Sequence, residues 1–194
     1  MTSQMLARKA GIEKATLYHH IVSKEDLLFQ ILKRGTSEGV ARSLLAERED
    51  RPEKQLRLFI QISIRTGLKR RKETVIATSE LRSLAPQHRR ILRALQRSHS
   101  DILRRIIERG MADGTFKVAD SRITTAAIQQ MLTGISTWYQ PEGRLTEEEL
   151  IRIYTDLVFG MVAVLAPAAG NSAAPELPTQ TISNVRTASA KKRM

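Results

Sequence analysis

The chain has 194 residues and no cysteine, which excludes a disulfide framework, thiol nucleophiles and zinc sites with cysteine ligands. Its formal net charge of +12 points to a polyanionic partner, most often nucleic acid. No signal peptide and no apolar run long enough to span a bilayer is visible, so we expect a cytoplasmic protein without membrane contact.

The first elements, in residues 2–24, follow the pattern of two short helices joined by a tight turn. Ala7 is small enough for the helices to cross closely, and Gly11 can take the left-handed conformation that ends the first of them. Leu17 then anchors the second helix, whose polar side chains between Lys14 and His19 face outward. This is the arrangement of a helix-turn-helix, which inserts one helix into the DNA major groove. The pattern predicts a protein that binds DNA and is not an enzyme.

The next elements are helices that are marked by their capping residues. Ser23 caps a helix with Asp26 in capping-box position, and the apolar spacing extends that helix to about residue 49. Pro52 occupies the favoured first-turn position of another helix. A shorter helix is expected at residues 75–84.

Three further helices complete the predicted pattern. Pro86 opens a long helix, Ser121 caps the following one, and Thr146 caps the last with Glu149 in capping-box position. No segment is predicted as a strand, so the fold class is all-α, a partial helix-turn-helix head with a helical body. Residues 167–194 lose helical periodicity and are rich in Pro, Ala, Ser, Asn and Thr, which predicts a disordered tail.

The chain lacks the sequence motifs of catalysis and of metal binding. It has no phosphate-cradling glycine loop, no GxSxG and no HExxH, so no catalytic residue is assigned. His19 and His20 would point about 100° apart on a helix, whereas a helical metal pair needs a spacing of three or four. We therefore expect neither a metal nor a cofactor. His88 and His99 are interpreted as polar-face or pocket-edge residues.

Two segments resemble one known family. The run TSQMLARKAGIEKATLYHHIVSKEDLL resembles the DNA-binding domain of the tetracycline-repressor (TetR) family. The run WYQPEGRLTEEELIRIYTDLVFGMV resembles the C-terminal end of its acyl-CoA-responsive and lipid-metabolism branches. The resemblance implies an Ω-shaped homodimer, in which each subunit has a three-helix DNA head and a ligand-binding body of about six helices. It also implies that the last two helices of each body pair with their symmetry mates.

The same resemblance implies which residues meet DNA. Lys14 and Thr16 fall where side chains reach base edges, and phosphate contacts from Ser3, Tyr18 and Lys24 would fix the register. The implied DNA-binding set is Ser3, Gln4, Lys14, Ala15, Thr16, Tyr18, His19, His20 and Lys24.

The predicted domains are a helix-turn-helix domain at residues 1–34, a ligand-binding and dimerisation domain at residues 35–166, and the tail at residues 167–194. The family head begins with a long first helix, whereas this chain starts at the second, so we expect the first helix to be missing. A start site assigned too late, a truncated polypeptide or a damaged gene would each explain this. We favour the first explanation, because the rest of the head is intact.

The body is expected to bind a small-molecule effector, an apolar compound or an acyl-CoA. Side chains that would line its pocket are Phe59, Met131, Ile135 and Trp138, although each also fits the apolar core of a helical body. The basic stretch at residues 65–109 fits either solvated helix faces or an anion site for the phosphates of a CoA thioester. The residues alone do not decide between these alternatives.

These features predict a ligand-responsive, dimeric transcriptional regulator, a repressor that binds a pseudo-palindromic operator in double-stranded DNA. Effector binding would favour a separation of the two heads that no longer matches the half-sites. The alternative is a dimerising ligand-binding or interaction protein whose truncated head no longer binds DNA.

Overall fold

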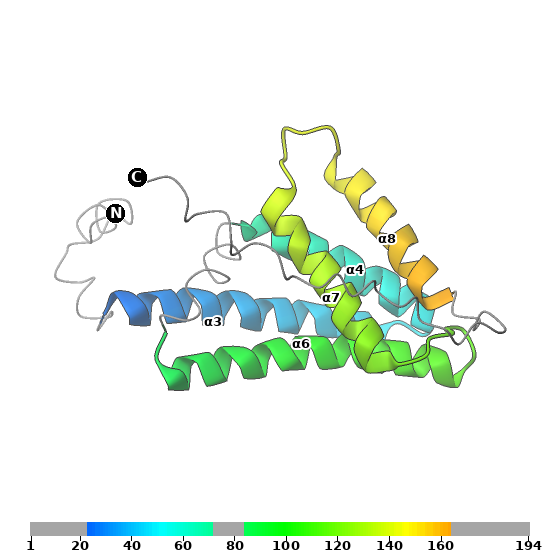
Figure 1. Cartoon of the computed structure of the whole chain (residues 1–194), viewed down its shortest axis with the longest axis horizontal. Helices are drawn as coiled ribbons and strands as arrows, with labels where there is room; N and C mark the ends of the chain where they lie inside the picture. Colours follow the sequence, from blue (N-terminus) through cyan, green and yellow to red (C-terminus); the bar gives the residue numbers. More distant parts are fainter. Residues whose placement is uncertain (1–22, 72–83, 164–194) are drawn as a thin grey trace, which may run out of the picture.

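The computed structural model describes residues 23–71 and 84–163 (Figure 1). Its elements are α3 (Lys24–Ser43), a 3₁₀ helix η1 (Leu44–Arg48), α4 (Pro52–Lys69), α6 (Pro86–Ala112), α7 (Ser121–Trp138) and α8 (Glu147–Ala163). The described residues form helices and no strand, which confirms the predicted all-α class. The expected helix-turn-helix, the short helix at residues 75–84 and the predicted tail lie outside the described residues, apart from a few at their edges.

Local capping interactions explain where two of the helices begin. Ser23 Oγ accepts the backbone N–H of Asp26 at 3.0 Å, which satisfies a free donor in the first turn of α3. Before α8, Thr146 Oγ1 accepts the N–H of Glu149 at 3.2 Å, and the Glu149 carboxylate accepts the N–H of Thr146 at 2.9 Å. This reciprocal pair confirms the predicted capping box.

The cap of α7 differs from the prediction. Asp120, not Ser121, is the N-cap, and its carboxylate accepts the backbone N–H groups of Arg122 and Ile123 at 2.7 and 2.9 Å. Ser121 is the first helical residue, and its hydroxyl donates to Glu108. Both residue types favour the cap position, but the carboxylate accepts two N–H groups at once.

The helix α3 crosses the predicted boundary between head and body. It is continuous from Lys24 to Ser43, so the boundary at residues 34/35 falls within it. Beyond Ser43 the helical path tightens into η1 and ends at Arg48, close to the expected end near residue 49. In Figure 1, α3 and α6 run side by side in the same direction, α8 lies above them, and α7 descends obliquely to the right-hand end of α6.

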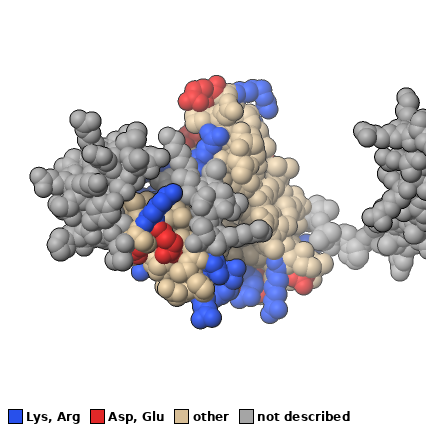
Figure 2. All heavy atoms as spheres, turned by 60° about the vertical axis from the view of Figure 1, so that its left-hand side comes forward, with Lys and Arg blue, Asp and Glu red and all other residues tan. Residues whose placement is uncertain are grey.

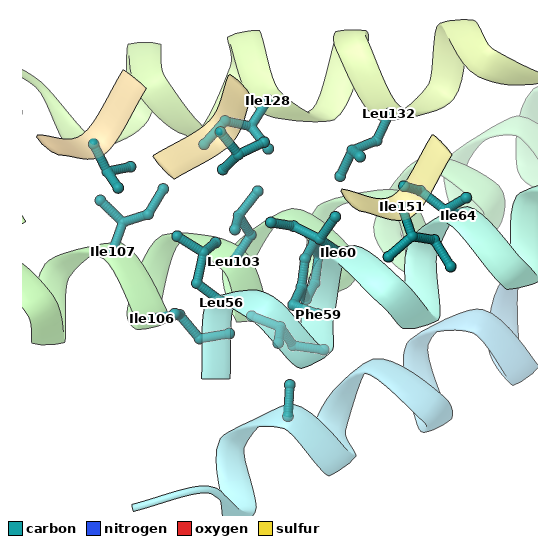
Figure 3. Packing of buried hydrophobic residues seen from close by; sticks show 14 of the residues in the cluster. Leu56, Phe59, Ile60, Ile64, Leu103, Ile106, Ile107, Ile128, Leu132 and Ile151 are labelled. Carbon is teal, nitrogen blue, oxygen red and sulfur yellow. The ribbon is translucent and has the colours of Figure 1, made fainter. Parts of the chain in front are cut away.

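The main core lies where α4, α6, α7 and α8 meet. Figure 3 shows side chains of these four helices pointing toward one another. Most residues of this core are aliphatic and a few are aromatic. They include Leu56, Phe59, Ile60, Ile64, Leu103, Ile106, Ile107, Ile128, Leu132 and Ile151. A second, smaller cluster joins α3 to α6 and consists of Phe29, Leu32, Leu84 and Leu92. None of the described helices is both long and apolar enough to cross a bilayer.

Candidate functional site

A cavity of about 570 Å³ opens between α3, α4, α6 and α7. This volume is within the range of small-molecule sites. Apolar side chains from α3, α4 and α7 line part of it, among them Ile31, Leu32, Ile64, Leu68, Leu132 and Ile135. Half of the described lining residues carry uncharged polar side chains: Thr36, Ser43, Ser63, Thr66, Gln96, His99, Ser100, Gln129, Gln130, Thr133 and Ser136.

A chain of hydrogen bonds in the cavity wall joins three helices. Ser43 Oγ of α3 lies 2.9 Å from Nε2 of His99 in α6, and Nδ1 of His99 lies 3.1 Å from Nε2 of Gln129 in α7. The His99 ring also contacts Phe59 of α4, with 5.0 Å between the ring centroids. Burial lowers the pKa of His99 below its usual value, against the opposing effect of the Gln129 hydrogen bond. The imidazole is therefore neutral near pH 7.

Some hydroxyl groups of the lining donate a hydrogen bond to a backbone carbonyl, and one has no hydrogen-bond partner within the described residues. Thr36 Oγ1 donates to the carbonyl of Leu32 at 2.8 Å, and Ser136 Oγ donates to the carbonyl of Thr133 at 2.8 Å. Their protons are used within their own helices, but their oxygens can still accept. Ser63 Oγ is buried and has no hydrogen-bond partner within the described part of the chain. A buried orphan hydroxyl is costly unless something fills its hydrogen bond.

Among the described lining residues, Arg70 is the one that carries a charge. Its guanidinium pairs with Glu38 of α3, which also accepts from Arg34 at 3.0 Å. These hydrogen bonds, with Arg34 contributing most, lower the pKa of Glu38 and keep it ionised. Gly35 leaves room for this arrangement, because a Cβ there would lie 2.7 Å from Nη1 of Arg70.

Beside the cavity, α6 carries an exposed basic face. Arg93 and Arg97 share a helix face with Gln96 and Ser100, which line the cavity at helical spacing from them. Both arginines are exposed and form no ion pair within the described residues. Figure 2 shows Lys and Arg side chains gathered along the lower side of the molecule, where Figure 1 has α6.

The structure brings only part of the predicted pocket set to the cavity. Ile135 lines it, whereas Phe59 lies fully buried in the core behind His99. Met131 packs against the core, and Trp138 is 50% exposed and stacks on Tyr154.

Of the predicted DNA-binding residues, only Lys24 is described. It is exposed and is the first residue of α3. The others, Ser3, Gln4, Lys14, Ala15, Thr16, Tyr18, His19 and His20, lie outside the described residues.

Of the described lining, the sequence predicted Ile135 and left His99 open as a pocket-edge residue. It missed the other lining residues, Ser43, Ser63 and Gln129 among them. A signal for the α3 wall was present, because Gly35, Thr36, Gly39 and Ser43 recur at helical spacing. Small residues on one helix face leave space, but which neighbour encloses that space depends on tertiary packing.

Comparison with known families decides the identity. Residues 49–162 match the family described as "Tetracyclin repressor-like, C-terminal domain", and residues 1–31 match "Bacterial regulatory proteins, tetR family". The first match alone covers more than half of the chain. The chain belongs to the TetR family. As a TetR-family protein it is a transcriptional regulator with a helix-turn-helix DNA-binding part and a ligand-binding domain.

Solved structures of TetR regulators agree with this assignment. PfmR from Thermus thermophilus is 32% identical, with a TM-score of 0.76 over 82% of this chain and 88% of its own. A tetR-family protein from Rhodococcus RHA1 is 25% identical, with a TM-score of 0.77 over 85% and 87%. AibR, solved with isovaleryl coenzyme A and operator DNA, is 27% identical, with a TM-score of 0.69 over 84% and 86%. No curated protein sequence matches the chain.

Proposed function

We propose that this protein is a ligand-responsive repressor that binds operator DNA as a homodimer and releases it when an effector occupies the cavity. One observation supports this most directly. The helix α3 begins at Lys24, within the residues that match the DNA-binding family, and its second half forms a wall of the cavity through Gly39 and Ser43. A single rigid element therefore belongs to both sites.

The switch follows from linkage between these two sites. A ligand in the cavity stabilises the position of α3 in which its contacts with that helix are best. The DNA-binding residues, which precede Lys24, would move with α3. Release requires only that the ligand bind the DNA-free arrangement better, by a few kcal/mol. Arg70 connects α3 to the end of α4 through Glu38, so displacement of α3 also changes the contacts of this lining residue.

Dimerisation is proposed through α7 and α8. Three large apolar side chains of these helices are exposed: Ile123 by 70%, Trp138 by 50% and Leu157 by 51%. Gly134 and Gly160 on the same helices have nothing within 4 Å of a hypothetical Cβ, which would allow a second copy to approach closely. Exposed apolar side chains gathered on a helix pair are typical of a protein interface. The proposed partner is a second copy of this chain, related by twofold symmetry.

The proposed effector is an acyl-CoA thioester. AibR, which is similar over most of the chain, was solved with isovaleryl coenzyme A and operator DNA. In the present protein the acyl group would occupy the cavity, and the CoA phosphates would contact Arg93 and Arg97 on the adjacent face of α6. Arginine pairs well with phosphate oxygens, which makes this exposed face suited to that role.

The proposal is tested by selecting binding sites from random double-stranded DNA and measuring affinity by fluorescence anisotropy. We expect a palindromic site that binds about 10³-fold or more tighter than random DNA. Isovaleryl-CoA and decanoyl-CoA, added separately, should then release the DNA, whereas free coenzyme A should not. Binding of acyl-CoA without any DNA binding would instead identify a ligand-binding or interaction protein.

A further inference from the structure

We infer that the cavity recognises an uncharged oxygen, a carbonyl or a hydroxyl, on an apolar ligand, and that it discriminates against a free carboxylate. This inference rests on the proposed function, because it specifies the effector chemistry of the same cavity. The recognising groups are Ser63 of α4 and the chain formed by Ser43, His99 and Gln129.

The charges of the lining exclude a good carboxylate site. A buried carboxylate needs a cation that is not already neutralised, or several donors directed at it. The guanidinium of Arg70 is already paired with Glu38, whose carboxylate adds negative charge beside the lining. His99 is neutral because of its burial. The other described lining residues carry no charge, and the exposed Arg93 and Arg97 lie outside the lining.

The donors of the lining suit a neutral oxygen. When the Gln129 amide donates to Nδ1 of His99, the neutral ring carries its proton on Nε2 and donates it to Ser43 Oγ. The Ser43 O–H proton then remains available to a ligand. Ser63 supplies a second hydroxyl donor when rotation about its Cα–Cβ bond turns the buried oxygen toward the cavity, since that oxygen has no partner within the described part of the chain.

Acceptors are available in the same lining. The hydroxyl groups of Thr36 and Ser136 each donate a hydrogen bond to a carbonyl of their own helix. Their oxygens can still accept a hydrogen bond from a ligand hydroxyl. A ketone, an ester, a thioester or an alcohol on an apolar skeleton therefore meets both kinds of partner. A thioester satisfies the rule because its carbonyl is uncharged.

Matched ligand pairs test the inference by isothermal titration calorimetry at pH 7.5. The linear pair is undecan-2-one and decanoate, and the cyclic pair is 4-tert-butylcyclohexanone and 4-tert-butylcyclohexanecarboxylate. We expect the ketone to bind at least tenfold tighter than the carboxylate in at least one pair. Equal or tighter binding of both carboxylates, or no binding of either ketone, would overturn the inference. Decanoyl-CoA, compared with undecan-2-one, shows whether the preferred carbonyl comes from a thioester or from a free ketone.

Variants assign the recognition to the named groups. Ser63→Ala should weaken ketone binding at least fivefold without changing carboxylate binding, and it should fold normally because Ser63 Oγ makes no hydrogen bond within the described residues. His99→Phe should have a similar effect. Ser98→Ala is the matched control, since Ser98 is exposed on α6 and donates only to Ala94. Unchanged ketone affinity in Ser63→Ala, with native thermal unfolding, would contradict the assignment.

DNA binding separates this inference from the proposed function. Tight ketone binding that leaves operator affinity unchanged would support the cavity chemistry and contradict the proposed switch. Release of operator by the carboxylates alone would support the switch and contradict the cavity chemistry.

Discussion

The carboxylate of Glu25, in the first turn of α3, lies 2.7 Å from Nδ1 of His88 in the first turn of α6. The same oxygen accepts the backbone N–H of Ala85 at 2.9 Å. The His88 ring also stacks on Phe29, with 3.8 Å between centroids and 4° between planes. These contacts join the N-terminal ends of two parallel helices, and Glu25 and Phe29 lie within the residues that match the DNA-binding family.

Removing the histidine ring should loosen this junction. The side chain of Phe29 is only 4% exposed, and the His88 ring covers one of its faces. In His88→Ala, Phe29 therefore loses its stacking partner. We expect the free energy of unfolding to fall by about 1 to 2 kcal/mol. Differential scanning calorimetry measures this, with Gln87→Ala, an exposed neighbour on α6, as the control. Equal unfolding temperatures of the two variants would contradict the structural role.

His99 should make stability depend on pH. Its pKa is lowered in the folded protein, chiefly by burial, and the groups that face it from α3, α4 and α7 are the uncharged Ser43, Phe59 and Gln129. Near pH 6.5 the unfolded chain therefore binds more protons than the folded one, and stability rises with pH. This contribution is full above about pH 6.5 and is lost as pH falls toward the lowered pKa.

The measurement is the loss of thermal stability between pH 7.5 and pH 5.5. We expect this loss to be smaller in His99→Gln, which cannot take up a proton, than in the unmodified protein. The same pH dependence in both proteins would show that another group is responsible.

Two glycine substitutions should have opposite effects on stability. A Cβ on Gly110 in α6 would lie 2.1 Å from a ring carbon of the buried Phe116, so Gly110→Ala must displace that ring. We expect a loss of about 1 to 3 kcal/mol. Gly67 in α4 has nothing within 4 Å, and Gly67→Ala should stabilise the helix by up to about 1 kcal/mol. Denaturant titration of both variants checks the signs.

Charge on the exposed apolar face of α8 should dissociate the proposed dimer. Leu157→Arg places a cation at the exposed leucine of α8, whereas Leu45→Arg changes a similarly exposed leucine in η1. Sedimentation equilibrium should give the mass of a single 21.8 kDa chain for Leu157→Arg and twice that mass for the control. A dimer in both variants would exclude this face.

Two lysines should affect DNA binding in different ways. Lys14→Ala should relax discrimination at one base pair, at a cost of about 1 to 3 kcal/mol on the preferred site. Lys24→Ala should weaken binding to specific and random DNA alike. The slope of the logarithm of affinity against the logarithm of salt concentration should become shallower by about one for each phosphate contact that is lost. Equal weakening on both kinds of DNA by Lys14→Ala would contradict its role in base recognition.

The helix starts could be predicted wherever the deciding interaction is local. Thr146 and Glu149 are three residues apart, so their capping box forms without help from the rest of the fold. Pro52 and Pro86 likewise begin α4 and α6, because proline at a first turn loses no hydrogen bond. The error at Asp120 and Ser121 arose between two adjacent capping residues, where the choice depends on which side chain finds another partner.

The sequence by itself determined the family, the all-α class and the caps of α3 and α8, because these depend on motifs and on interactions within one helical turn. Only the tertiary structure decided that Ser43, His99 and Gln129, from three separate helices, meet in one cavity wall. It also decided that Phe59 belongs to the core while Ile135 faces the cavity. Helical periodicity identifies an apolar face, but whether that face meets a neighbouring helix or an open space depends on how the helices pack.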